Sequence, residues 1–171
     1  GAFRFLNRIY RQADNYGKLL EENYKAYSPE IEISKEMKEL RFSTHTMIKK
    51  WHDDIEEKLQ FNTAIAGIME HLNNVSSIKD PESLSANDKI IFAEANTEMF
   101  RLIYPFAPHV SEEVWNMIGQ KKLVHESGVP EYNPAYLVKD EVTYVVQANG
   151  KLRGKLEVSL ATSDEDVKKM A

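Results

Sequence analysis

The chain has no cysteine among its 171 residues. This absence excludes disulfides, thiolate nucleophiles and cysteine-ligated zinc, and it is compatible with a cytosolic protein. No apolar run approaches the length that a membrane-spanning helix needs. No charged-then-apolar leader opens the chain either, so nothing in the sequence indicates secretion.

Common catalytic and cofactor motifs are missing as well. The sequence contains no Gly-x-Ser-x-Gly elbow, no Gly-x-x-x-x-Gly-Lys phosphate loop and no dinucleotide fingerprint. Its histidines do not form a His-Glu-x-x-His zinc motif; they are His45, His52, His71, His109 and His125. We therefore expect no catalysis, no bound metal and no cofactor in this chain.

The bulk composition is that of an ordinary globular protein, with 42% hydrophobic and 29% charged residues. The length allows one domain or one and a half, with a real core. The formal net charge of −5 argues against a protein that coats nucleic acid indiscriminately. Local basic patches remain compatible with that charge.

The first two-thirds of the chain shows the apolar periodicity of amphipathic helices. Apolar positions such as Phe3, Leu6 and Ile9 recur at helical spacing in the first helix, and Ile68 and Met69 are expected to face inward in the third. Short connections favour antiparallel neighbours, which predicts an up-and-down bundle of about five helices. The expected helices cover roughly residues 2–24, 34–59, 62–75, 85–104 and 108–119.

Local signals support the helix boundaries. Ser85 and Asp88 form a capping-box pattern at the start of the fourth helix. Pro105 ends that helix, because a proline ring does not fit a helix interior. Pro108 suits the first turn of the next helix, and Gly119 closes it.

The composition changes after the predicted bundle, which we assign to residues 1–119. Residues 120–138 read as a linker containing Gly128, Pro130 and Pro134. Residues 139–171 then read as the start of a small α+β domain. That domain would be truncated, because a helix capped at Thr162 has room for only about two turns before the chain stops. We therefore expect the chain to be a piece of a larger protein.

Residues 142–158 have the pattern of a β-hairpin, with an Asn149-Gly150 pair at the tip. We expect a three-residue loop with Gly150 in the left-handed bulge position, because that register separates apolar from polar residues. It places Val142, Tyr144, Val146, Leu152 and Leu156 on one face. The other face would carry Thr143, Gln147, Lys151, Arg153 and Lys155.

Two groups of cations are candidates for contacting phosphates. Lys151, Arg153 and Lys155 alternate along the second strand with no acid between them, although a plain solvated face with Glu157 nearby is the alternative. On the first helix, cations stand at i, i+4 and i+7, before the first acid of the chain; they are Arg4, Arg8 and Arg11. We expect an RNA backbone contact at both places.

Other conspicuous side chains have structural explanations. Lys49 and Lys50 are followed four residues later by Asp53 and Asp54, which predicts ordinary helix ion pairs. His109 lies where one helix stops and another starts, and a packed corner explains it better than catalysis does.

Four strings resemble leucyl-tRNA synthetases. Residues 147–155 resemble the Gln-x-Asn-Gly-Lys-x-Arg-Gly-Lys signature at the start of the C-terminal domain of the bacterial enzymes, with Ala148 where Val or Ile is more usual. Residues 102–115 resemble a corner shared by the anticodon-binding domains of the class I enzymes for leucine, valine and isoleucine, and residues 4–10 and 61–66 resemble other parts of that domain. Val129-Pro130 departs from the Trp-Pro usual in the family.

The resemblance implies a class I synthetase anticodon-binding bundle, and the beginning of a C-terminal domain, in a cytoplasmic monomer that joins leucine to its tRNA with ATP and magnesium. The two ATP-binding motifs of the class are absent, so the chain lacks the catalytic and editing domains. The resemblance implies tRNA and the remaining domains as partners, and no membrane. The implied tRNA-binding residues are Arg4, Arg8, Arg11, Asn149, Lys151, Arg153 and Lys155.

Two alternatives stay open. The bundle could be a protein-interaction module that docks a partner on its acidic surface and hairpin edge. It could also be the equivalent domain of a valyl- or isoleucyl-tRNA synthetase.

Overall fold

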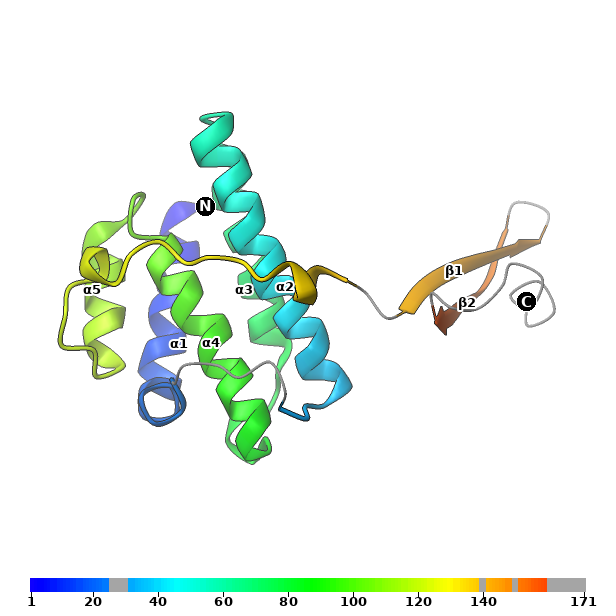
Figure 1. Ribbon diagram of the computed structural model, residues 1–171, viewed down its shortest axis with the longest axis horizontal. Helices are drawn as coiled ribbons and strands as arrows, with labels where there is room; N and C mark the ends of the chain where they lie inside the picture. Colours follow the sequence, from blue (N-terminus) through cyan, green and yellow to red (C-terminus); the bar gives the residue numbers. More distant parts are fainter. Residues whose placement is uncertain (25–30, 139–140, 149–150, 160–171) are drawn as a thin grey trace. The chain divides into compact units, whose positions relative to one another are not determined.

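The structure is a computed structural model that describes residues 1–24, 31–138, 141–148 and 151–159, the last two ranges through their backbone alone (Figure 1). The chain divides into two compact units, Gly1–Pro134 and Ala135–Ala171.

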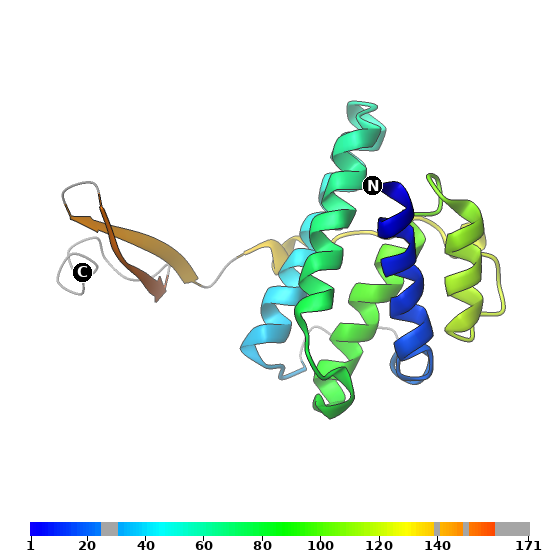
Figure 2. The ribbon, with the colours of Figure 1, turned by 180° about the vertical axis from the view of Figure 1, so that it is seen from behind.

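The described part of the first unit is mainly helical, as the sequence predicts, and the five expected helices are present (Figures 1 and 2). They are α1 (Ala2–Asn23), α2 (Lys35–His52), α3 (Phe61–Ser77), α4 (Ala86–Leu102) and α5 (Pro108–Met117). A π-helical turn, Asp53–Glu57, follows α2, and Leu59 then adopts a φ of 53°. The second helix therefore ends earlier than the expected end near residue 59.

Helix α4 is the centre of the bundle and packs against α1, α2, α3 and α5. Most of its side chains are buried, and Ile91, Phe92, Met99 and Phe100 are 0% exposed. Its remaining face carries the partly buried Glu94, Glu98 and Arg101. Because α1, α2, α3 and α5 all pack on α4, this helix sets the position of each of them in the bundle.

The buried face of α1 is rotated from the predicted one. Phe5 and Ile9 contact the core, whereas Phe3 is 80% exposed. One residue turns the helix by about 100°, so Phe3 lies about 200° from Phe5 on the helix surface. Met69 is also exposed at 36%, because Ile68 takes the inward position in α3. The inward assignments of Phe3 and Met69 were wrong.

The predicted cap of α4 is confirmed and has a second role. Ser85 Oγ accepts the backbone N–H of Asp88 at 3.2 Å. The Asp88 carboxylate does not return to Ser85; its Oδ1 accepts the N–H of Ser34 at 2.9 Å. Ser34 is itself the N-cap of α2, so Asp88 joins the starts of two helices.

In the second unit, strands β1 (Glu141–Ala148) and β2 (Lys151–Ser159) pair antiparallel. Tyr144 pairs with Leu156, and Ala148 pairs with Lys151 at the end of the ladder. Val142 pairs with Val158 and Val146 with Gly154, so the register places Val142, Tyr144, Val146 and Leu156 on one face, as the sequence predicts. The register shifts by one residue between Val146 and Gln147, with Arg153 as the extra residue on β2, and two residues then separate the last pair. The predicted bulge position, Gly150, lies outside the described residues.

Candidate nucleic-acid interface

The three arginines of the first helix lie on the exposed side of α1. Arg8 reaches α3, where its Nη2 donates to Asn73 Oδ1 at 2.9 Å and to Ser76 Oγ at 3.3 Å. Arg4 and Arg11 are exposed one turn to either side and make no hydrogen bond or ion pair with the described residues. The structure thus combines two unpaired cations with an arginine that is held against α3, and α1 and α3 lie side by side (Figure 2).

A chain of hydrogen bonds next to these arginines links α3, α2 and α4. Asn74 Nδ2 lies 2.8 Å from Ser43 Oγ, which lies 2.9 Å from His71 Nδ1. His71 Nε2 lies 3.0 Å from the backbone carbonyl of Ala95. Burial lowers the pKa of His71 to about 4, so the imidazole is neutral near pH 7. Nothing in the sequence indicated this hydrogen-bond network, because its residues come from three helices.

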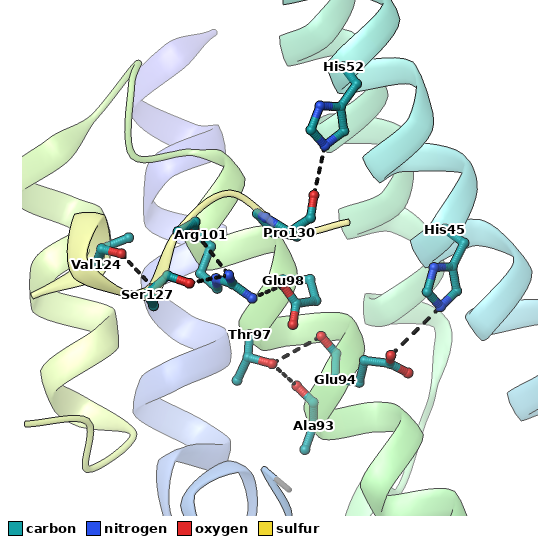
Figure 3. A network of polar contacts seen from close by, with 11 residues as sticks. His45, His52, Ala93, Glu94, Thr97, Glu98, Arg101, Val124, Ser127 and Pro130 are labelled. Atoms are coloured by element: carbon teal, nitrogen blue, oxygen red, sulfur yellow. Dashed lines mark hydrogen bonds and ion pairs between the residues drawn. The ribbon is translucent and has the colours of Figure 1, made fainter. Parts of the chain in front are cut away.

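Residues 123–133, which we call the strap, follow α5 and lie along the bundle (Figure 3). Val124 is 2% exposed and belongs to the core. Arg101 of α4 donates from Nη2 to the carbonyls of Ser127, at 2.7 Å, and Gly128, at 2.9 Å. Its Nη1 lies 2.7 Å from Glu98 Oε2. Part of the segment expected as a linker is therefore attached to the central helix.

Two histidines of α2 bond the end of the strap, and Figure 3 shows the first of these contacts, from His52 to Pro130. His52 Nε2 donates to the Pro130 carbonyl at 2.7 Å. His45 Nδ1 accepts the backbone N–H of Asn133 at 3.1 Å. Pro130 is buried, whereas Val129, at the position where the family usually has Trp, is 50% exposed. The docking of the strap therefore uses backbone groups and the proline.

Two buried side chains near the end of the strap, His45 and Glu94, have strongly shifted pKa values. His45 Nε2 lies 3.7 Å from Glu94 Oε1, and both side chains are mostly buried. Burial raises the pKa of Glu94 to about 7, with the charge of Glu98 adding to the effect. Burial also lowers the pKa of His45 to about 4, with Arg41 contributing. Of these groups, His45 bonds the strap through the backbone N–H of Asn133.

The corner between α4 and α5 is packed, as the sequence suggested. Ser111 Oγ donates to the Phe100 carbonyl at 2.6 Å and is 0% exposed. Trp115 is 3% exposed, and its Nε1 donates to the Lys122 carbonyl at 3.0 Å. His109 is exposed at this corner.

The predicted lysine–aspartate pairs on α2 are confirmed. Lys49 and Asp53 lie 2.5 Å apart, and Lys50 and Asp54 lie 2.7 Å apart. These lysines are therefore engaged within the bundle.

A model of the anticodon-binding domain of tRNA ligases matches residues 32–169, which is most of the chain. The chain belongs to this family of anticodon-binding domains. The chain is 41% identical over its full length to the leucine–tRNA ligase of Fervidobacterium nodosum and 39% identical to that of Rippkaea orientalis. It spans 20% and 19% of those two proteins, about a fifth of their length.

A solved structure has the same fold as this anticodon-binding domain. It is the ternary complex of the Agrobacterium radiobacter K84 LeuRS with tRNA and LeuAMS. The similarity has a TM-score of 0.76 at 27% identity and covers 98% of this chain and 20% of that chain. The expected resemblance to leucyl-tRNA synthetases is therefore confirmed.

The remaining predicted site residues of the domain belong to the second unit. Asn149 is outside the described residues. Lys151, Arg153 and Lys155 belong to β2, and their side chains are outside the described part of the structure. Among the described residues, no group of His, Asp and Glu side chains could hold a metal ion, and no helix is both long and apolar enough to cross a membrane.

Proposed function

We propose that this chain is the tRNA-binding and positioning portion of a leucine–tRNA ligase, which attaches leucine to its tRNA. The observation that carries the proposal is the alignment of the whole chain with leucine–tRNA ligases at up to 41% identity. The similarity to a LeuRS in complex with tRNA supports it. The parent protein would use ATP and magnesium, and the groups that bind them would belong to its other domains.

The proposed mechanism is electrostatic positioning of the tRNA. Arg4 and Arg11 would contact phosphates from α1, and Arg8 would add its charge while bonded to α3. On the hairpin, the contacting residues would be Asn149, Lys151, Arg153 and Lys155. Phosphate contacts set the position and orientation of the nucleic acid, whereas they carry no sequence information.

We further propose the domain organisation that the sequence predicts: a bundle over residues 1–119, a linker over 120–138 whose strap residues are attached to the bundle, and the start of a small α+β domain over 139–171. The parent would be a cytoplasmic monomer. Its other domains would be the second partner of this chain, beside tRNA. The helical fold of the first unit supports the bundle, and the family of the relatives supports the existence of further domains.

A filter-binding titration of the 171-residue chain with a leucine tRNA transcript tests the proposal. Since the net charge is −5, we expect weak binding that depends on local cations and decreases steeply with salt. Replacing Arg4 and Arg11 with Ala should weaken binding and reduce the salt slope by roughly 0.7–0.9 for each lost phosphate contact. Replacing Lys151, Arg153 and Lys155 with Ala should do the same.

The matched control removes two exposed cations elsewhere, Lys38 on α2 and Lys79 after α3. This variant changes the net charge as much as the double arginine variant does, and it should leave the affinity nearly unchanged. Undetectable binding at low salt would refute the RNA function and favour a protein-docking bundle. Equal losses of affinity in the control and arginine variants would show that binding depends on net charge and not on the arginines of α1.

A further inference from the structure

The amide of Asn74 has one orientation that its neighbours permit. The Ala95 carbonyl only accepts hydrogen bonds, so His71 Nε2 carries the proton. The buried, neutral imidazole then accepts at Nδ1, and the hydroxyl of Ser43 donates to it. Because that hydroxyl has used its proton, Ser43 Oγ accepts from Asn74 Nδ2. Asn74 Oδ1 is left as an acceptor on an exposed residue.

The neighbouring amide, Asn73, is oriented in the opposite sense. A guanidinium has donors only, so Arg8 Nη2 must contact the oxygen of Asn73. Asn73 Nδ2 is then the remaining group, and it is a donor. Asn73 and Asn74 are both exposed, and no hydrogen bond to Asn73 Nδ2 or Asn74 Oδ1 is found within the described part of the chain.

The surface of α1 and α3 therefore presents an oriented donor and an oriented acceptor beside cations. Arg8 bonds directly to Asn73, and Arg4 and Arg11 lie one turn to either side of Arg8 on α1. Phosphate contacts from the arginines would place a sugar-phosphate backbone here, and amides held in one orientation lose little freedom when they bind. A ribose 2′-hydroxyl both donates and accepts, and A-form RNA displays these hydroxyls in a wide, shallow minor groove.

We propose that Asn73 and Asn74 bind ribose 2′-hydroxyls of an RNA helix whose phosphates lie on the arginines of α1. This inference rests on the proposed tRNA function and adds a group that recognises RNA as such. Ser43 is a positioning residue in this scheme, because it contacts Asn74 and fixes the direction of its amide. His71 acts indirectly, because it accepts the hydrogen bond of the Ser43 hydroxyl and so fixes the direction in which that hydroxyl points.

The test compares two ligands for the full 171-residue chain: a leucine tRNA transcript and the same sequence with every 2′-hydroxyl replaced by fluorine. The fluorinated RNA keeps the A-form helix and lacks the hydroxyl donor. The wild-type chain should bind it less tightly than the natural RNA. Asn74→Ala should weaken binding of the natural RNA by about threefold to tenfold, reduce the preference for it, and leave the salt slope unchanged. Ser43→Ala should reduce the same preference by a smaller factor.

Asn116→Ala, at an exposed asparagine on α5, is the matched control and should bind both RNAs as the wild type does. Thermal unfolding of each variant shows whether it is folded, and the ratio of the two affinities is independent of the folded fraction. The proposal is overturned if Asn74→Ala binds like the wild type, or if it loses affinity equally for both RNAs. If Arg11→Ala still weakens binding in that case, the tRNA function stands and only the hydroxyl contact fails. Absence of any binding by the wild type would instead refute the proposed function itself.

Discussion

Arg101 Nη2 donates to the backbone carbonyl of Ser127 at 2.7 Å, across 26 residues of chain. The arginine side chain is only 12% exposed, and it also bonds Gly128 and Glu98. Charge-assisted hydrogen bonds of this kind are stronger than neutral ones. One side chain of the central helix therefore fixes the strap onto the bundle.

Arg101→Met should destabilise the first unit by about 3 kcal/mol. The substitution keeps most of the apolar volume, but it leaves Glu98 buried without its cation and removes the donor to two strap carbonyls. Urea unfolding measures the loss, and hydrogen exchange should show faster exchange of the strap amides. Arg11→Met, at an exposed arginine, should stay within about 0.5 kcal/mol. A similar small effect for Arg101→Met would show that Arg101 contributes little to the docking of the strap.

The pH dependence of stability should reveal Glu94. Its pKa is raised from 4.5 to about 7 by burial, so the folded state favours the neutral carboxyl. This contribution is fully present below about pH 4.5 and is lost as the pH rises through about 7. Glu94→Gln is neutral at every pH. Relative to the wild type it should therefore gain up to about 3 kcal/mol between pH 4.5 and pH 7.5.

The measurement is urea unfolding of both proteins at several pH values. The comparison cancels the contribution of His71, whose lowered pKa of about 4 acts in the opposite sense, because His71 is present in both proteins. A difference that stays constant across this pH range would mean that Glu94 titrates normally.

Two helix glycines should respond oppositely to alanine. A Cβ on Gly17 would lie 2.9 Å from the backbone carbonyl oxygen of Met117, which cannot move without shifting α5. Gly17→Ala should cost about 1–3 kcal/mol. A Cβ on Gly67 would meet the Lys50 side chain at 3.2 Å, and that chain can move aside. Gly67→Ala should be neutral or stabilise by up to about 1 kcal/mol, because alanine favours helices. Thermal unfolding compares them, and equal losses would exclude a specific contact at Gly17.

The starts of α2 and α4 should be energetically coupled through Asp88. Ser85→Ala removes one cap and should cost about 1 kcal/mol. Asp88→Ala should cost about 1–2 kcal/mol, because it leaves the N–H of Ser34 without its acceptor. The two losses should not add fully in the double variant, since both substitutions act on the same first turn. Full additivity in urea unfolding would show that the two contacts are independent.

Local patterns in the sequence were sufficient to predict the helices, the Ser85 cap of α4 and the family. Apolar periodicity, Ser85 and Pro105 are local signals, and local signals follow from backbone geometry within a few residues. The motif at residues 147–155 is also a local signal, because a family motif is recognised from the sequence without knowledge of the fold. The ion pairs of Lys49 and Lys50 were equally predictable from the sequence, since helix geometry alone brings residues i and i+4 together.

Tertiary structure alone decided which faces are buried and which polar groups meet. Phe3 and Phe5 fit a helical stripe equally well, and only the position of α4 against α1 excludes Phe3 from the core. Arg101 joins backbone carbonyls that carry no side-chain signature in the sequence. The orientation of Asn74 depends on Ser43 of the neighbouring helix α2, since a hydrogen bond needs its partner within about 3 Å and the fold alone sets that distance.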